Sequence, residues 1–320
     1  MPDRSSYPDG APCWVDLTAP DPGVARAFYG AVIGWEFEDA GADYGHYTMC
    51  LWRGKPVAAV MPPPPGAEGM PAMWNVYLAT QDIDTVVARI PEAGGKPVMG
   101  PHDIPGAGRM AFAFDPTGAS FGLWQPGGHY GAQLQSEPGA MCWNELNTTD
   151  GATADRFYHA LFGYTQEQIG DGKQFDYTTW KVPGGGDPVC GRLQASAAQL
   201  RGGPSAWGTY FAVADVDAAA RKVAEQGGTV LGAAFDSPFG RMCPVLDPLG
   251  AAFTLCTLPG RDRARVGRGS AAGQPRVLAN SSRISSVLPV SPRRGKIRSR
   301  LLWCASAFMS VTASVAMATW

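Results

Sequence analysis

The sequence predicts an α+β protein made of four βαβββ units, paired into two modules with curled mixed sheets and helices on their outer faces. Two observations predict this fold. The first is an internal repeat, because Cys13–Leu17 (Cys-Trp-Val-Asp-Leu) returns in the second half of the chain as Cys142–Leu146 (Cys-Trp-Asn-Glu-Leu). The second is periodicity, because each copy passes from strand-like alternation to the spacing of an amphipathic helix. The copies lie one domain length apart, which is typical of a duplicated domain.

Further landmarks recur with the same spacing between the two copies. Each copy has an aspartate, then a Phe-Tyr pair seven residues later, then a glycine. Aspartate is a good helix N-cap and glycine a common helix end, so the landmarks bracket one predicted helix in each module. The matched positions are Asp21 and Asp150, Phe28-Tyr29 and Phe157-Tyr158, and Gly34 and Gly163.

The elements of the first module, residues 1–125, follow one another in a fixed order. A strand at residues 12–18 precedes a helix that begins at Asp21-Pro22 and ends at Gly34. Pro at the first helical position supports this start. Strands are then predicted at residues 35–38, 46–52, 57–61 and 73–79, a helix at 82–90, and strands at 96–99, 109–114 and 120–124, with a hairpin turn at Asp115-Pro116-Thr117-Gly118.

A linker rich in Gly and Pro, residues 126–139, leads into the second module at residues 140–258. This module repeats the order of elements. Strands are predicted at residues 141–147 and 206–213, helices at 153–162 and 215–226, and three further strands after each helix. The Gly-Arg-Met and Asp-Pro-x-Gly sequences at 108–118 recur at 240–250, which indicates that both units of the module are duplicated.

Charge divides the chain into two parts. Residues 1–260 contain 15 Lys and Arg against 27 Asp and Glu, whereas residues 261–320 contain 11 Lys and Arg and a single acid. An acidic body argues against nucleic acid as a partner. The seven cysteines include no CxxC pair, and the first twelve residues contain no apolar signal segment, so we expect reduced thiols and a cytoplasmic protein.

The segment 259–320 is predicted to be a basic, disordered tail. Residues 301–320 contain no charge and have the length of a membrane span, but Ser, Thr and Ala make the segment only moderately hydrophobic. Membrane binding is therefore not expected.

The repeated motifs resemble those of the vicinal oxygen chelate superfamily, which includes glyoxalase I, bleomycin-resistance proteins and extradiol dioxygenases. The resemblance covers residues 12–257 and is closest to the two-module glyoxalase-like proteins. The residues that carry it are Asp21, Phe28-Tyr29 and Gly34, then Tyr77 with Asp82-Ile83-Asp84, then the turn at Asp115–Gly118, with counterparts at Asp150, Phe157-Tyr158, Gly163, Tyr210, Asp215-Val216-Asp217 and Asp247–Gly250.

The resemblance implies metal ligands on the first and last strands of the units. At those positions this chain has one indole, one amide and one glycine in the first module, and an indole, a glycine and a hydroxyl in the second. Divalent metals prefer imidazole, thiolate or carboxylate donors, so no metal and no other cofactor is predicted. The six residues are Trp14, Asn75, Gly122, Trp143, Gly208 and Thr254.

Asp16 and Glu145 are the candidate catalytic residues. Each lies two residues after a tryptophan, on the strand face predicted to line the concave sheet. A carboxyl beside an indole in an apolar site has a raised pKa and suits general acid–base chemistry. The alternative is a structural ion pair with Arg109 or Arg241.

Aromatic side chains on the same face suggest a site for a flat small molecule, because Trp and Tyr combine apolar area with one polar group. The alternative is that they fill the interior between the modules. His46, His102, His129 and His159 show no metal-binding spacing. The predicted substrate-binding residues are Trp14, Asn75, Tyr77, Arg109, Trp143, Tyr210 and Arg241.

Three functions therefore remain open. The preferred one is metal-independent binding of a small aromatic or carbonyl-containing molecule in the concave sheet. The alternative is a lyase, hydroxylase or dioxygenase that uses Asp16 and Glu145 with a divalent metal. The third is a surface interaction protein whose concave sheets are filled. The expected partner is a small molecule, and the expected state is a monomer with an internal pseudo-dimer or a homodimer.

Overall fold

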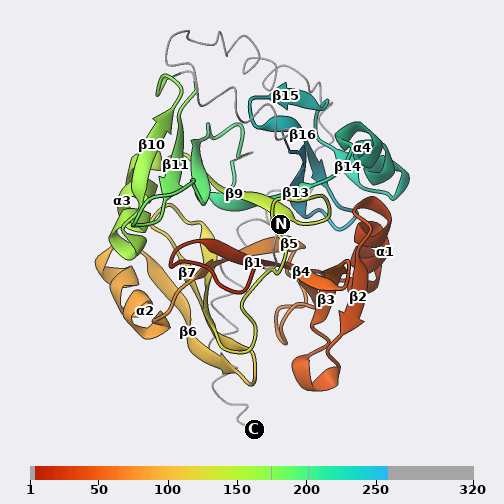
Figure 1. Cartoon of the computed structure of the whole chain (residues 1–320), viewed down its shortest axis with the longest axis horizontal. Coiled ribbons are helices and arrows are strands. Elements are labelled where there is room, and N and C mark those ends of the chain that lie inside the picture. The colour runs from red at the N-terminus through yellow and green to blue at the C-terminus, as the bar shows by residue number, and fades with distance from the viewer. Residues whose placement is uncertain (1–3, 174, 201, 259–320) are drawn as a thin grey trace.

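The computed structural model describes residues 4–173, 175–200 and 202–258, and these residues form two mixed sheets of eight and nine strands with four α-helices (Figure 1). The predicted α+β class and its four βαβββ units are confirmed. The basic tail at 259–320 and its apolar end lie outside the described residues. Within the described part of the chain, no helix is long and apolar enough to cross a membrane.

The first module contains two βαβββ units, and its strands agree closely with the predicted ones. A short 3₁₀ turn at Ala42–Tyr44 lies between β2 and β3. The first unit comprises β1 (Pro12–Thr18), α1 (Pro22–Val32), β2 (Glu36–Asp39), β3 (Thr48–Trp52) and β4 (Lys55–Met61), and the second β5 (Met73–Ala79), α2 (Ile83–Glu92), β6 (Lys96–Ile104), β7 (Gly108–Phe114) and β8 (Ser120–Pro126).

The second module repeats this order, with one additional short strand, β15, that pairs with β16. Its elements are β9 (Met141–Thr148), α3 (Gly151–Phe162), β10 (Thr165–Ile169), β11 (Tyr177–Lys181), β12 (Cys190–Gln194), β13 (Ala206–Ala212), α4 (Val216–Glu225), β14 (Thr229–Val230), β15 (Phe235–Ser237), β16 (Gly240–Leu246) and β17 (Ala252–Thr257).

The strand order shows how each module is assembled from its two units. In each unit the first strand pairs in parallel with the last, as β1 does with β4 and β5 with β8. Antiparallel pairing of β1 with β5 then joins the units, and β9 joins β13 in the same way. Both sheets are open at their edges and neither is strongly curled, so their inner faces are shallower than the predicted concave sheets.

The helices begin at or within two residues of their predicted starts, with α3 at Gly151 rather than at 153, and an aspartate caps each of them. Asp21 accepts hydrogen bonds from the amides of Gly23 and Val24, and Asp82 and Asp150 each cap their helix through the third amide. Asp215 does the same for α4. Caps of this kind supply partners for helix amides that have none within the helix.

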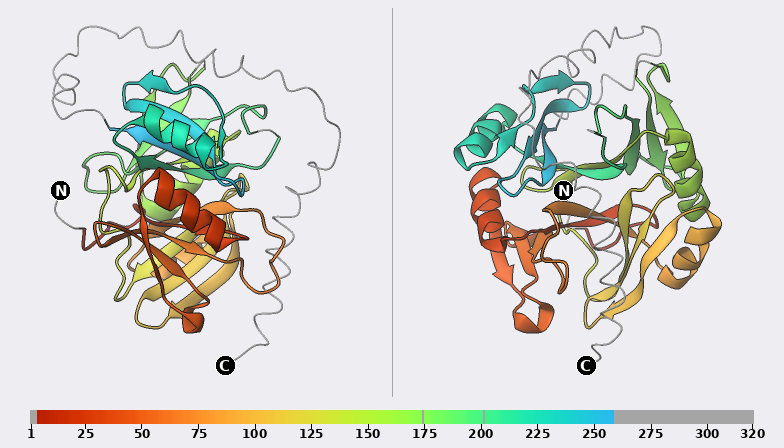
Figure 2. Two further views of the ribbon diagram at one scale, coloured as in Figure 1. Left: turned by 90° about the vertical axis from the view of Figure 1, so that its right-hand side faces the viewer. Right: turned by 180° about the vertical axis from the view of Figure 1, so that it is seen from behind.

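The modules meet through the sheet faces opposite Asp16 and Glu145. Trp74 and Phe211, from β5 and β13, lie with ring centroids 4.9 Å apart at the centre of this interface. The helices flank it in pairs, with α1 beside α4 on one side and α2 beside α3 on the other (Figure 2). Trp74 and Phe211 therefore belong to the core between the modules.

The repeated Phe-Tyr and Asp-Pro-x-Gly motifs meet across this interface. The Tyr29 hydroxyl donates a 3.1 Å hydrogen bond to Asp247 of the other module and accepts one of 3.0 Å from Trp74. Reciprocally, the Tyr158 hydroxyl donates to Asp115 at 3.2 Å. All of these side chains are buried, so the two motifs that identify the repeat also join the modules.

Candidate functional site

Asp16 stands at the centre of a buried polar cluster on the inner face of the first sheet. Its Oδ2 accepts hydrogen bonds from the hydroxyls of Tyr77, at 2.7 Å, and Tyr47, at 3.2 Å. Its Oδ1 accepts one of 2.8 Å from the amide of Asn75. The indole of Trp14 completes the set by donating to the Tyr47 hydroxyl at 2.8 Å. We call these five residues the Asp16 cluster.

Strand register brings the cluster together. Trp14 lies opposite Tyr77, and Asp16 lies opposite Asn75, across the antiparallel β1–β5 pair. Because side chains alternate along a strand, all four project from the same face. Gly122 of β8 pairs with Tyr77, and a Cβ at this position would overlap the Tyr77 ring. The glycine therefore provides the space in which that ring lies.

Burial controls the protonation of Asp16. The residue is 1% exposed, and removal from water raises the pKa of its carboxyl, while the hydrogen bonds from Asn75, Tyr77 and Tyr47 lower it in part. Burial also raises the pKa of both tyrosines. The carboxyl therefore retains its proton to higher pH than an exposed aspartate does. The alternative that Arg109 pairs with Asp16 is wrong, because these three neutral donors hold the carboxyl.

A matching cluster surrounds Glu145 in the second module. The Tyr210 hydroxyl donates a 2.6 Å hydrogen bond to Glu145 Oε1, and the Trp143 indole donates to the Tyr177 hydroxyl at 2.7 Å. Burial raises the pKa of Glu145, and hydrogen bonds from Tyr210, Tyr177 and Asn147 lower it in part. We call Glu145, Trp143, Asn147, Tyr177 and Tyr210 the Glu145 cluster.

The amide donor comes from different strands in the two clusters. In the first module it is Asn75 on β5, which lies opposite Asp16. In the second module the residue opposite Glu145 is Gly208, and a Cβ there would meet the Asn147 amide nitrogen at 3.4 Å. Asn147 of β9 thus places its amide in the space that Gly208 leaves. The two modules retain the same donor through an exchange between neighbouring strands.

His129 of the linker covers the first cluster. The His129 ring packs edge-on against Trp14 at 4.5 Å, and its backbone carbonyl accepts a 2.9 Å hydrogen bond from Trp124. Burial lowers the pKa of His129 to about 4, so the ring is neutral at physiological pH. Trp14 is consequently 3% exposed, whereas Trp143 and Tyr210 are only partly buried.

The two predicted arginines lie elsewhere. Arg109 pairs with Asp84 at 2.6 Å and with Asp103 at 2.9 Å. Arg241 pairs with Asp217 at 2.8 Å and with Asp236 at 3.2 Å. These are solvent-accessible ion pairs at equivalent positions of the two modules, so an ion pair between Glu145 and Arg241 is also wrong. The predicted contact of Arg109 and Arg241 with a substrate stays a prediction.

The residues at the expected metal-ligand positions do not fit a divalent cation. Trp14 and Asn75 turn N–H groups toward their neighbours, and Gly122 has no side chain. Each cluster contains a single carboxyl, whose oxygens already accept hydrogen bonds from phenols and an amide. Among residues 4–173, 175–200 and 202–258, no three His, Cys, Asp or Glu side chains gather as a metal site would require.

Four residues at the site were not predicted. Tyr47, Tyr177 and Asn147 belong to the two clusters, and His129 packs over the Asp16 cluster. One signal in the sequence could have identified two of them. Tyr47-Thr48 recurs as Tyr177-Thr178, at nearly the same spacing as the two tryptophans of the repeat. Asn147 and His129 have no counterpart of the same type in the other module, so the repeat gives no indication of them.

Comparison with known proteins identifies relatives over most of the chain. A model of the Glyoxalase/Bleomycin resistance protein/Dioxygenase superfamily matches residues 13–123. The chain is 42% identical over 259 residues to "Putative glyoxylase CFP32" of Mycobacterium tuberculosis, covering 80% of this chain and 97% of that protein. It is 39% identical over 269 residues to the anthracycline biosynthesis protein DnrV of Streptomyces peucetius, covering 79% and 94%.

Solved structures share the fold at low sequence identity. The 2,3-dioxygenase LapB from Pseudomonas sp. KL28 gives a TM-score of 0.55 at 12% identity, covering 80% of this chain and 96% of that one. The Mn(II)-bound glyoxalase from Novosphingobium aromaticivorans gives 0.54 at 16% identity, covering 78% and 82%. Identities this low show the fold alone, because one fold supports many functions.

Proposed function

Because the chain belongs to the glyoxalase/bleomycin resistance protein/dioxygenase superfamily, we propose that it binds a small planar aromatic or carbonyl-containing molecule at the Glu145 cluster, without a metal. The observation that carries this proposal is the partly exposed pair Trp143 and Tyr210 beside a buried carboxyl. The equivalent pair in the first module is covered by the linker.

The chemistry of the cluster suits a carbonyl compound. An indole offers a flat apolar surface, and a phenol offers a hydrogen-bond donor at its edge. Glu145 has a raised pKa, and a protonated carboxyl can itself donate a hydrogen bond to a carbonyl oxygen. A ligand ring would lie against Trp143, and its oxygen would accept a hydrogen bond from the protonated acid, which the Tyr210 hydroxyl holds in place.

The names of the relatives agree with this class of ligand. DnrV of Streptomyces peucetius and DauV of Streptomyces sp. strain C5 are both named as anthracycline biosynthesis proteins. Anthracyclines are planar aromatic ketones. A hydroxyanthraquinone is therefore a suitable probe, since it combines fused aromatic rings with carbonyl oxygens.

Titration with 1,4-dihydroxyanthraquinone, followed by quenching of tryptophan fluorescence, tests the proposal. Tyr210→Phe should weaken binding about tenfold, because it removes the hydrogen bond that positions Glu145, and such a bond contributes roughly 1–2 kcal/mol. Tyr77→Phe is the matched control, since it removes the equivalent hydroxyl from the covered cluster. The proposal fails if both variants bind as the wild type does, or if both lose affinity equally.

Acid–base catalysis at Glu145 is a second candidate, and the raised pKa of the buried carboxyl favours it. Glu145 would accept a proton from the carbon next to a ligand carbonyl and return it to the same or a neighbouring atom. Exchange of such protons for deuterium, followed by NMR, measures this step. Glu145→Gln should abolish exchange and retain binding, whereas Asp16→Asn should leave both unchanged.

A further inference from the structure

The two carboxyl clusters differ in the strand that provides room for a tyrosine ring. In the first module Tyr77 lies over Gly122 of β8, where a Cβ would overlap its ring. In the second module Tyr177 lies over Gly191 of β12, where a Cβ would overlap its hydroxyl. The glycine is therefore on the last strand of the second unit in one module and on the last strand of the first unit in the other.

This exchange changes the surroundings of the tyrosine that holds the carboxyl. Tyr77 is 4% exposed above its glycine, whereas Tyr210 is only partly buried. The residue that pairs with Tyr210 on β17 is Thr254, at the position that Gly122 has in the first module. Because the Thr254 side chain occupies the space that the first module leaves for a ring, Tyr210 cannot lie against β17 as Tyr77 lies against β8.

Thr254 also bonds to the cluster. Paired residues of neighbouring strands project from the same face of a sheet, and Thr254 is partly exposed there. Burial raises the pKa of Tyr210, and a hydrogen bond from the Thr254 hydroxyl lowers it in part. The Tyr210 hydroxyl in turn donates to Glu145 at 2.6 Å. A chain of two hydrogen bonds thus runs from Thr254 through Tyr210 to Glu145.

The two ends of this chain have opposite hydrogen-bonding character. Thr254 directs its only hydroxyl proton to Tyr210, so its oxygen is left as an acceptor. Burial raises the pKa of Glu145, and a protonated carboxyl is a donor. Two O–H···O bonds in sequence separate the ends by about 5 Å. The first module has no such acceptor, because Gly122 has no side chain.

We infer that Thr254 selects aromatic ligands that carry a hydroxyl group meta to a carbonyl group, an inference that rests on the binding proposed at the Glu145 cluster. The carbonyl oxygen accepts a hydrogen bond from Glu145, and the hydroxyl donates one to Thr254. The oxygens of a ring with this substitution lie about as far apart as the two ends of the chain. A hydroxyl ortho to the carbonyl instead donates to that carbonyl within the ligand, so it does not reach Thr254.

Titration with 2-hydroxyanthraquinone and with 1-hydroxyanthraquinone, followed by quenching of tryptophan fluorescence, tests the inference. A mildly acidic buffer keeps both phenols protonated. The wild type should bind the 2-hydroxy isomer about five- to tenfold more tightly, because only that isomer gains the additional hydrogen bond. Thr254→Val retains the size of the side chain without its hydroxyl and should abolish this preference, while binding of the 1-hydroxy isomer remains. Thr254→Ser restores the hydroxyl and should retain the preference.

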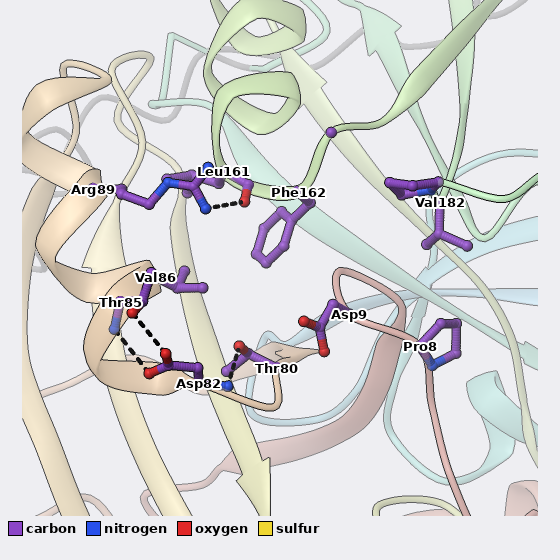
Figure 3. A pocket seen from close by; sticks show the side chains of 12 residues that line it. Pro8, Asp9, Thr80, Asp82, Thr85, Val86, Arg89, Leu161, Phe162 and Val182 are labelled. Carbon is purple, nitrogen blue, oxygen red and sulfur yellow. Dashed lines mark hydrogen bonds between the residues drawn. The ribbon is translucent and has the colours of Figure 1, made fainter.

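A cleft of about 510 Å³ between the modules, beside α2 and α3, is a second place at which an aromatic probe can bind (Figure 3). None of the cluster residues lines it. Val182 is one of the residues that do, so Val182→Trp narrows the cleft without altering the Glu145 cluster. This control variant should show the isomer preference of the wild type.

Thermal unfolding confirms that each variant is folded, and Thr254→Ala replaces Thr254→Val if the valine variant is not. The inference is overturned if the wild type binds both isomers equally, if the preference survives removal of the Thr254 hydroxyl, or if Val182→Trp alone removes it. In each case the proposed binding at Glu145 is still judged by the Tyr210→Phe and Tyr77→Phe titrations. Absence of binding by both isomers overturns the inference and the proposed function together.

Discussion

The Asp16 and Glu145 clusters have the same hydrogen-bond scaffold and differ in what lies over them. Both contain a buried carboxyl, two phenols, one indole and one amide. His129 of the linker packs against Trp14 in the first cluster, and Trp14 is almost fully buried there. Trp143 is partly exposed. The two modules therefore share the polar scaffold, whereas the linker between them restricts the access of solvent and ligands to the Asp16 cluster.

The comparison also separates structural from functional interpretations. A cluster that is sealed by its own chain contributes to stability, since its groups have no route to a ligand. A cluster of the same composition with a partly exposed edge can contribute to stability and also bind a ligand. Equivalent substitutions in the two modules should therefore change the free energy of unfolding by unequal amounts. The difference between the two changes measures how far the roles of the clusters have diverged.

Truncation of the two indoles gives the largest expected difference. Trp14→Ala should lower the free energy of unfolding by about 3–5 kcal/mol, as is usual for a buried tryptophan. Trp143→Ala should lower it by clearly less, because part of that ring already contacts solvent. Urea unfolding followed by circular dichroism gives both values. Equal losses would show that the second cluster is as tightly enclosed as the first.

The next largest effect concerns the glycines beside the clusters. Gly122→Ala forces a Cβ into the Tyr77 ring and should destabilise the protein by about 1–3 kcal/mol, as overpacking does. Gly208→Ala is the matched change in the second module. Its Cβ would approach Asn147 at 3.4 Å, an ordinary contact, so the free energy of unfolding should hardly change. A large loss for Gly208→Ala would contradict this expectation and would show that Asn147 cannot move away from the added Cβ.

The sequence predicts most of this fold because the fold depends on local signals that occur twice. Aspartate caps, Phe-Tyr pairs and Asp-Pro-x-Gly turns mark the same elements in both modules, and alternation assigns Trp14 and Asp16 to one strand face. The parallel pairing of β1 with β4 was not predicted, because no local pattern of residues contains it. The weak curl of the sheets depends on side-chain packing over many strands, which no local pattern contains.

The candidate site is only partly predictable for a related reason. Asp16, Glu145, Tyr77 and Tyr210 lie on the strand faces that alternation assigns to the inner side of the sheets, so their proximity could be anticipated. Arg109 lies on β7, which β5 and β8 separate from β1, and two aspartates on exposed elements provide closer partners than Asp16. The position of the histidine over the first cluster depends on the path of the linker, and a linker has no periodicity from which its path could be derived.

A third comparison concerns how the stability contributed by Asp16 and by Glu145 depends on pH. Burial raises the pKa of Asp16 and of Glu145 above the values in the unfolded chain. The folded state then binds these protons more tightly, so the stability that they contribute is complete below the unfolded pKa and is lost as pH rises through the folded pKa. Asp16→Asn and Glu145→Gln mimic the protonated groups and should flatten this decline. Urea midpoints measured from about pH 4 to about pH 9 test the expectation, and a wild type whose stability rises over this range would contradict it.

The smallest expected effect concerns the exposed ion pairs, which are alike in the two modules. Arg109 and Arg241 each bridge a helix residue and a neighbouring strand or loop residue of their own module, Asp84 and Asp103 in one case, Asp217 and Asp236 in the other. Water and salt screen such pairs. Arg109→Ala and Arg241→Ala should therefore produce small and similar decreases in unfolding temperature that vanish in high salt. A larger loss for one arginine would show that it has acquired a role the other lacks, and a ligand contact of the kind predicted for both would then be the first role to test, with the same anthraquinone titration.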